Sequence, residues 1–244
     1  MCVHGRRSHG RQAALTARLA RELSSEGMRL AYLDLAKEGR VPAGTAALLW
    51  LGPKTPLLAQ ELELLRLYLQ IGGRILVAGQ AGSELVVNPL LDGFGLRFGA
   101  GVVIDPQVSG APEVQGQAAA MVAAYTDHAV VARLAASGLR TLLTRPAPIE
   151  ITGKKKRGSV QPLAAAAPES WIEEDPHSRV WRRGEGAKGG AILAALWSAD
   201  CSKVEARRSD EARLGLLSDL QMMSNGGMVH AGNRALALNL ISWL

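Results

Sequence analysis

Aromatic residues are scarce in this chain of 244 residues, of which only 4% are Phe, Trp or Tyr. The core must therefore be filled mainly by Leu, Ala, Val and Ile. No aromatic residues suited to stacking bases surround the one basic run, Lys154–Arg157. The net charge of +6 then indicates a mildly basic surface, and we expect no nucleic acid partner. The run could contact anionic lipid heads, or it could be a solvated loop.

Cysteines and long apolar runs are also lacking. The two cysteines, Cys2 and Cys201, could form one disulfide but no disulfide framework. No segment approaches the ~18 consecutive apolar residues of a membrane-spanning helix, and the first residues lack the apolar region of a signal peptide. No Cys, Asp or Glu cluster completes a metal site with His4 and His9, so we expect neither a metal nor a cofactor.

The first eighty residues alternate between helical and extended patterns. The spacing of leucines predicts helices over Gly10–Ser25 and Leu58–Leu69. Short apolar runs predict strands at Leu30–Leu33, Ala46–Leu51 and Arg74–Ala78. This alternation predicts an α/β fold, with a mostly parallel, doubly wound sheet and helices on both faces.

A doubly wound fold usually opens with a strand, but a polar loop, His4–Gly10, begins almost at once. We therefore expect that the first strand is missing and that residues 1–244 are one α/β domain excised from a longer protein.

The middle of the chain is less regular and embellishes this plan. Asn88–Phe98 suggests a short helix and a turn, Gly101–Asp105 an edge strand, and Ser109–Ala120 a loop of small residues. We expect Val160–Ala165 to pair with Ala191–Trp197 as the sheet continues.

The C-terminal segment has a clear pattern. Arg213–Asp219 is predicted to be a central strand, and Asn233 to cap a final helix. Leu236, Leu240 and Trp243 lie on one face of that helix, so we expect them to be buried against the sheet.

Several segments in this order resemble the soluble domain of the gliding-motility-type auxiliary components of ABC transport systems. The shared features are a strand and Gly-Pro turn, a "GGR" strand, an "LL…FGL…VVIDP" stretch, an "SWIE" motif, and a C-terminal "RLGLLSD…NG…GNR…N…WL" pattern. They lie at 47–57, 72–77, 89–106, 170–173 and 213–244. This chain departs from the family at His4-Gly5-Arg6-Arg7, where the family often has Gly-His-Gly-Glu.

The resemblance implies a class I glutamine-amidotransferase-like fold without its activity. It also implies an extracytoplasmic position, on the periplasmic face of the bacterial inner membrane, anchored by transmembrane helices outside this chain. The implied partners are ABC-transporter membrane subunits or other envelope proteins, or an exported glycan or peptide, with a link to gliding motility or export in some bacteria.

An active amidotransferase would need a nucleophilic Cys on the turn after a central strand. The turn after Arg74–Ala78 holds Gly79 and Gln80 and has no Cys or Ser at its centre. We therefore expect a non-catalytic protein. The alternative is a cysteine-dependent hydrolase or amidotransferase that uses Cys201, although the adjacent Asp200 would raise the pKa of its thiol.

Open α/β sheets bind ligands at the carboxyl ends of their strands. Gly52, Gly79, Gln80 and Asp219 follow predicted strands and are the candidate ligand-binding residues. For Asp219 the competing interpretation is structural, because its carboxylate could accept backbone hydrogen bonds from the following turn.

Overall fold

The computed structural model describes residues 2–4, 16–155, 157–178, 180–184 and 187–244. Within these residues, eleven strands form one large sheet. Half of it is parallel, with neighbouring strands in the order β2 (Ala31–Leu33), β1 (Cys2–His4), β3 (Leu48–Leu51), β4 (Arg74–Ala78) and β13 (Glu211–Leu217). The expectation of a missing first strand was wrong, because Cys2–His4 pairs with both β2 and β3.

The other half of the sheet is antiparallel, so the expected mostly parallel sheet is found only in part. After β13 come β12 (Ile192–Asp200), β10 (Ser159–Ala166), β7 (Ala119–Tyr125) and β8 (Leu142–Thr144). The predicted pairing of Val160–Ala165 with Ala191–Trp197 is confirmed, since Val160 lies opposite Trp197.

A side branch of the sheet corrects the interpretation of Asn88–Phe98. A helix, α5, covers Glu84–Leu91, but Phe94–Phe98 is a strand, β5, antiparallel to β9 (Ile149–Lys155). The side chain of Asn88 joins α5 to β5: its Nδ2 donates to the Phe98 carbonyl and its Oδ1 accepts from the Phe98 N–H, each at 2.9 Å.

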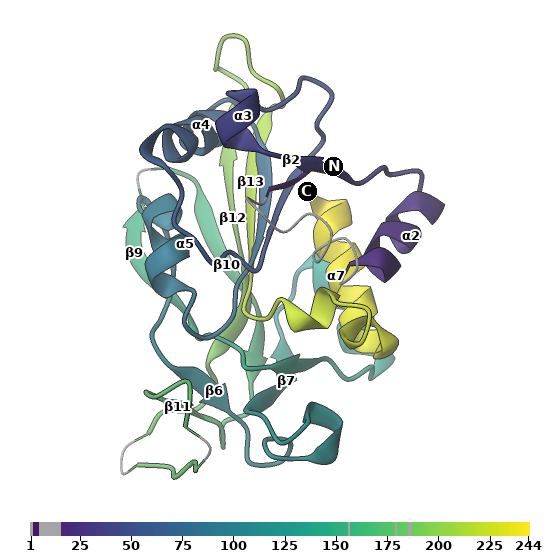
Figure 1. Cartoon of the computed structure of the whole chain (residues 1–244), viewed down its shortest axis with the longest axis vertical. Coiled ribbons are helices and arrows are strands. Elements are labelled where there is room, and N and C mark those ends of the chain that lie inside the picture. Colours follow the sequence, from purple (N-terminus) through teal and green to yellow (C-terminus); the bar gives the residue numbers. More distant parts are fainter. Residues whose placement is uncertain (1, 5–15, 156, 179, 185–186) are drawn as a thin grey trace.

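A separate two-stranded sheet lies at the lower end of the molecule (Figure 1) and consists of β6 (Val102–Ile104) and β11 (Trp171–Glu173). The strand expected at Gly101–Asp105 therefore exists, but in this small sheet and not at the edge of the main one. The expected loop Ser109–Ala120 contains a 3-10 turn, η1 (Pro112–Val114), and the first residues of β7.

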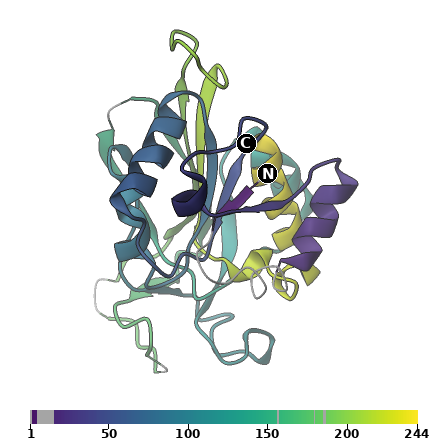
Figure 2. The same ribbon diagram turned by 45° about the horizontal axis from the view of Figure 1, so that its top comes forward.

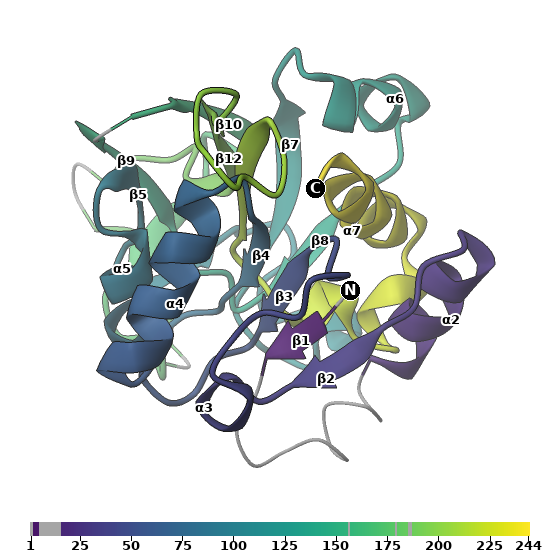
Figure 3. The same ribbon diagram turned by 90° about the horizontal axis from the view of Figure 1, so that it is seen from above.

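Helices cover both faces of the main sheet, as predicted (Figures 2 and 3). One face packs against α3 (Leu35–Glu38), α4 (Ala59–Gln70) and α5, and the other against α2 (Ala17–Ser25), α6 (Ala129–Ser137) and α7 (Ala231–Trp243). The strands between these layers are apolar on both sides. In β3, Leu49 and Leu51 belong to the α7 side of the core, whereas Leu48 and Trp50 belong to the α4 side.

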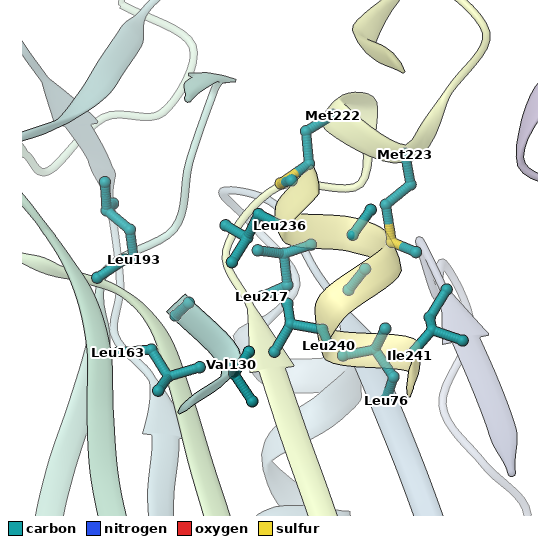
Figure 4. Packing of buried hydrophobic residues seen from close by; sticks show 14 of the residues in the cluster. Leu76, Val130, Leu163, Leu193, Leu217, Met222, Met223, Leu236, Leu240 and Ile241 are labelled. Carbon is teal, nitrogen blue, oxygen red and sulfur yellow. The ribbon is translucent and has the colours of Figure 1, made fainter. Parts of the chain in front are cut away.

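The final helix packs on the parallel half of the sheet, as expected. Leu236 and Leu240 are fully buried beside Leu217 and Leu76 (Figure 4). Two details differ from the prediction. Trp243 is only partly buried, because its ring faces the Arg213 guanidinium, 5.0 Å from the ring centroid. Asn233 lies inside the helix, and the residue at the N-cap is His230.

Two 3-10 turns, η2 (Gln221–Met223) and η3 (Gly227–Val229), connect β13 to α7. Met222, Met223 and Met228 from this connection are buried in the same core as α7. The connection is therefore packed against the sheet, which fixes the position of the residues at the end of β13.

Candidate functional site

Three of the four predicted site residues lie side by side at the carboxyl ends of parallel strands. Leu51 of β3 and Leu217 of β13 both lie opposite Ala78 of β4. Beyond these ends, the Gly52 N–H donates to the Ala78 carbonyl at 2.8 Å and the Gly79 N–H donates to the Leu217 carbonyl at 2.9 Å. Asp219 follows two residues after Leu217, so the sequence correctly placed these residues at one edge.

The space beside the two glycines is filled by side chains. A Cβ atom at Gly52 would lie 2.2 Å from the Leu220 Cδ2 atom, and one at Gly79 would lie 2.9 Å from the Phe98 ring. Gly52 also has a φ of +57°, which disfavours any residue with a side chain. The positive φ favours glycine at position 52, and close packing against Phe98 favours it at position 79, so both residues are accounted for without a ligand.

The turn after β4 is a tight entry into α5. The Gln80 N–H donates to the Ser83 Oγ atom at 3.0 Å, and the Ser83 N–H donates back to the Gln80 carbonyl at 2.9 Å. The Ala81 N–H reaches across to the Arg145 carbonyl at 3.0 Å. The turn is thus held by the backbone and side chain of Ser83 and by the segment after β8.

Asp219 is fully buried and holds two distant segments together. Its Oδ2 accepts a hydrogen bond from the Thr144 N–H at 2.7 Å, and its Oδ1 accepts one from the Gln221 N–H at 2.6 Å. Burial raises the pKa of Asp219 to about 7, and the backbone donors of Thr144, Gln221 and Met222 oppose this rise. The carboxyl group therefore has the structural role that the competing interpretation assigned to it.

A groove of about 410 Å³ lies above this buried carboxyl and was missed from the sequence. We call it the edge groove. One wall comes from β8 and the β13–α7 connection, including Thr144, Gln221 and His230, and the other from the η1 turn, including Gln115 and Gln117. The Asp219 hydrogen bonds to Thr144 and Gln221 therefore fix two positions of one wall.

A second hollow, of about 690 Å³, lies on the other side of the η1 turn and shares Gln115 and Gln117 with the edge groove. We call it the Arg145 pocket. Its remaining lining residues come from the start of β7, the segment after β8 and the segment after β11: Gly116, Ala118, Arg145, Pro176, His177, Ser178 and Trp181. Nothing in the sequence pattern distinguished Arg145 from the other arginines.

Cys201 lies near the opposite edge of the sheet, directly after β12 and close to the start of β13. It is buried and free. Its sulfur lies within hydrogen-bond distance of the Gln70 carbonyl at 3.5 Å, the Ala199 carbonyl at 3.7 Å and the Arg157 guanidinium at 3.4 Å. Among the described residues, none of its hydrogen-bond partners is a histidine, so the base required by the cysteine alternative is not beside it.

Of the side chains in the basic run and of the N-terminal histidines, the structure describes that of Arg157. Arg157 donates to the Leu69 and Gln70 carbonyls and thereby ties its loop to α4. Lys156 and His9 lie outside the described residues. In the part that the structure describes, no group of three or more His, Cys, Asp or Glu side chains could hold a metal ion.

Comparison with family models matches residues 4–228 to the family described as an ABC-type uncharacterized transport system. The chain belongs to this family. It is therefore an auxiliary component of an ABC-type transport system, which suggests association with transporter components. No helix in the described residues is long and apolar enough to cross a membrane.

Solved structures show the same fold at low sequence identity. The structure described as the mmIFT52 N-terminal domain matches with a TM-score of 0.72 and 17% identity, covering 100% of this chain and 96% of that chain. A putative ThuA-like protein from Bacteroides uniformis matches with a TM-score of 0.57 and 12% identity, covering 99% and 89%. One from Parabacteroides merdae has a TM-score of 0.53 and 12% identity, covering 99% and 88%.

The ThuA-like neighbours fit an amidotransferase-like, mixed α/β fold. At these identities the similarity shows the fold alone. No curated protein matches the chain. The assignment of the chain to its family therefore rests on the family-model match over residues 4–228.

Proposed function

We propose that this chain is a non-catalytic, extracytoplasmic domain of an ABC-transporter auxiliary component, with a class I glutamine-amidotransferase-like fold. It acts as a scaffold for transporter membrane subunits or other envelope proteins, or binds an exported glycan or peptide, in export or gliding motility. Membrane segments outside these residues hold it at the periplasmic face of the inner membrane. The observation that carries the proposal is the family match over residues 4–228.

The arrangement of the carboxyl edge supports a binding role over a catalytic one. The turn of Gly79 and Gln80, where an amidotransferase would have its nucleophile, contains no thiol or hydroxyl at its centre. Asp219 uses both carboxyl oxygens for backbone hydrogen bonds, and Leu220 and Phe98 fill the space beside Gly52 and Gly79. These residues have structural roles at the carboxyl edge, and a ligand or partner would bind in the edge groove or the Arg145 pocket beside them.

Crosslinking in cells tests the scaffold role. The full-length protein, expressed from its own locus with an affinity tag, should crosslink to the membrane subunit of an ABC transporter, identified by mass spectrometry after purification from membranes. A tagged, unrelated membrane protein of equal abundance is the control. Equal recovery of transporter subunits with both proteins would contradict the proposal.

Labelling of an introduced cysteine tests the location. Lys203 is exposed in the loop between β12 and β13, whereas Cys201 is buried. A Lys203→Cys variant of the full-length protein should react with a membrane-impermeant maleimide in cells whose outer membrane is permeabilised. The wild-type protein is the control for reaction at its own thiols. Labelling of Lys203→Cys only after the inner membrane is lysed would place the domain in the cytoplasm.

The alternative, a hydrolase or amidotransferase that uses Cys201, makes a different prediction. A Cys201→Ser variant would then lose a measurable glutaminase or esterase activity of the wild-type protein. We expect both proteins to be equally inactive, because the thiol is enclosed by carbonyl groups and the Arg157 guanidinium. Thiol-dependent turnover by the wild-type protein would establish the alternative.

A further inference from the structure

Arg145 has an unusual backbone conformation that its neighbours enforce. Its φ is +55°, in a region that residues with side chains rarely adopt. Its N–H donates to the Ala118 carbonyl at 2.8 Å, and its carbonyl accepts from the Ala81 N–H at 3.0 Å. Arg145 is thus pinned between the turn after β4 and the start of β7. Such strained backbone positions are concentrated at functional sites.

A second strained residue lies in the same pocket. Gln115 has a φ of +54°, and both it and Arg145 line the Arg145 pocket. Among the described residues, the only other non-glycine residue with positive φ is Ala206, which lies in the β12–β13 loop. Two of the three strained positions therefore belong to one hollow of about 690 Å³.

The Arg145 guanidinium has an unmet hydrogen-bonding requirement. Its Nε atom is buried, and among the described residues it has neither a hydrogen-bond partner nor a carboxylate that forms an ion pair with the guanidinium. A buried donor on a charged group is costly to leave unpaired. Arg208 provides the contrast: it lines another hollow, but its guanidinium donates to the Pro42, Ala43 and Thr45 carbonyls.

The rest of the pocket is suited to a negatively charged group. The nine described residues that line it include no Asp or Glu. The nearby Asp175 carboxylate accepts the His177 N–H at 2.9 Å and so serves its own turn. The side chains of Gln115 and Gln117 have no hydrogen-bond partner among the described residues and present amide donors. The Trp181 Nε1 donates to the Ser178 carbonyl at 2.9 Å, which fixes the orientation of the indole ring.

We propose that the Arg145 pocket binds a ligand through a carboxylate or phosphate group, which pairs with the Arg145 guanidinium. A planar guanidinium presents paired donors that match either anion, and these charge-assisted hydrogen bonds are stronger than neutral ones. Gln115 and Gln117 orient the ligand, and Trp181 contacts its apolar part. The proposal goes beyond the transport role, because the pocket would bind an anion whether or not the domain contacts a transporter.

Calorimetric titration of the whole chain with defined probes tests the site. Inorganic phosphate and N-acetylglycine present the two anions, and N-acetylglycinamide has the shape of the second without its charge. The variant Arg145→Asn removes the guanidinium and suits the backbone, because Asn tolerates positive φ better than Arg. The matched control Arg140→Asn removes an exposed arginine from the same part of the chain.

We expect at least one anion to bind the wild-type chain and the neutral amide not to bind. The anion that binds identifies the chemical source, phosphate or carboxylate. Arg145→Asn should weaken that binding about tenfold or more, the range expected for a charge-assisted hydrogen bond, and should melt at or above the wild-type temperature. Arg140→Asn should bind as the wild type does.

Three results would overturn the proposal. The first is equal anion affinity of the wild-type chain and Arg145→Asn, and the second is equal binding of N-acetylglycine and its neutral amide. The third is an absence of binding by both anions at concentrations of about 10 mM, where a dissociation constant near 1 mM would be evident. None of these results bears on the crosslinking to transporter subunits, so the two proposals fail separately.

Discussion

Asp219 should make the domain less stable as the pH rises from acidic to neutral values. Its side chain is fully buried, and burial raises the pKa of Asp219 from 3.8 to about 7. The backbone N–H groups of Thr144, Gln221 and Met222 oppose this shift, but desolvation is the largest cause. The native state therefore retains a proton that the unfolded chain releases at a much lower pH.

The sign and size of the effect follow from proton linkage. Because the pKa is higher in the native state, the protonated form contributes stability that is fully present below pH 3.8 and is lost as the pH rises through about 7. The difference between 7 and 3.8 is about 3 units, which corresponds to about 4 kcal/mol at 1.36 kcal/mol per unit. About 3 kcal/mol of this should be lost between about pH 5 and pH 8.

Urea denaturation of the wild type and of Asp219→Asn at several pH values measures the effect. The Asn variant cannot titrate, and subtracting its curve cancels the contributions of the histidines. Since one backbone N–H then faces an amide NH₂ group, a constant offset of about 1–3 kcal/mol is expected as well. Asp92→Asn, which removes an exposed carboxylate, is the matched control and should follow the wild-type curve.

The test is how the difference in unfolding free energy between the wild type and Asp219→Asn changes with pH. A constant offset between the two curves does not test the pKa of Asp219. A difference in unfolding free energy that stays constant between about pH 5 and pH 8 would refute the reasoning. It would mean that the three backbone donors outweigh burial and that Asp219 is ionised in the native state throughout this range.

Two further predictions concern α7. In urea denaturation, Asn233→Ala should lower the unfolding free energy by about 2–4 kcal/mol, because the Leu142 N–H and carbonyl each lose a 2.8 Å hydrogen bond. The control Asn239→Ala removes a single hydrogen bond, to the Val130 carbonyl, and should cost about half as much. Trp243→Ala should lower the unfolding free energy by about 2 kcal/mol, measured in the same way, because the indole is only partly buried and contacts Arg213. A loss as large as that of a fully buried tryptophan would contradict the second prediction.

The sequence predicted those parts of the fold whose signals are local. The apolar runs at β3, β4 and β13 identify strands buried on both faces, and the leucine spacing of α4 and α7 identifies their buried sides. The mixed sheet was not predictable in the same way. The direction in which β12 pairs with β13 depends on the loop at residues 201–210, which returns the chain beside β12, rather than on the strand pattern.

Short strands that pair with segments distant in the sequence were also missed, because their own residues carry little local signal. The strand β1 has three residues, and its partners β2 and β3 come much later in the chain. Gly93 and Gly95 made β5 resemble a turn, but its partner β9 begins fifty residues further on, and the Asn88 side chain holds β5 to α5. Such contacts override local propensity.

The site residues show the same division. Position at the carboxyl edge could be predicted for Gly52, Gly79 and Asp219, because strand ends are local features. The partner of Asp219 could not, since Thr144 lies 75 residues away in sequence. Asn233 was expected to cap α7, but the residue at the N-cap is His230. The Asn233 side chain instead forms hydrogen bonds with Leu142 of β8.

The contrast between the Asp219 carboxyl group and the Arg145 guanidinium is the strongest argument for where an anion binds. At the edge itself Asp219 has two backbone donors, so a ligand there would have to replace hydrogen bonds that already stabilise the fold. In the adjacent pocket the buried Nε donor of Arg145 has no partner among the described residues, and hydrogen bonds from other segments hold its backbone at a positive φ. An anion in the pocket would pair with the guanidinium and displace no hydrogen bond that the described residues form with it. Anion binding is therefore favoured at Arg145, beside the edge that the parallel strands form, and not at Asp219.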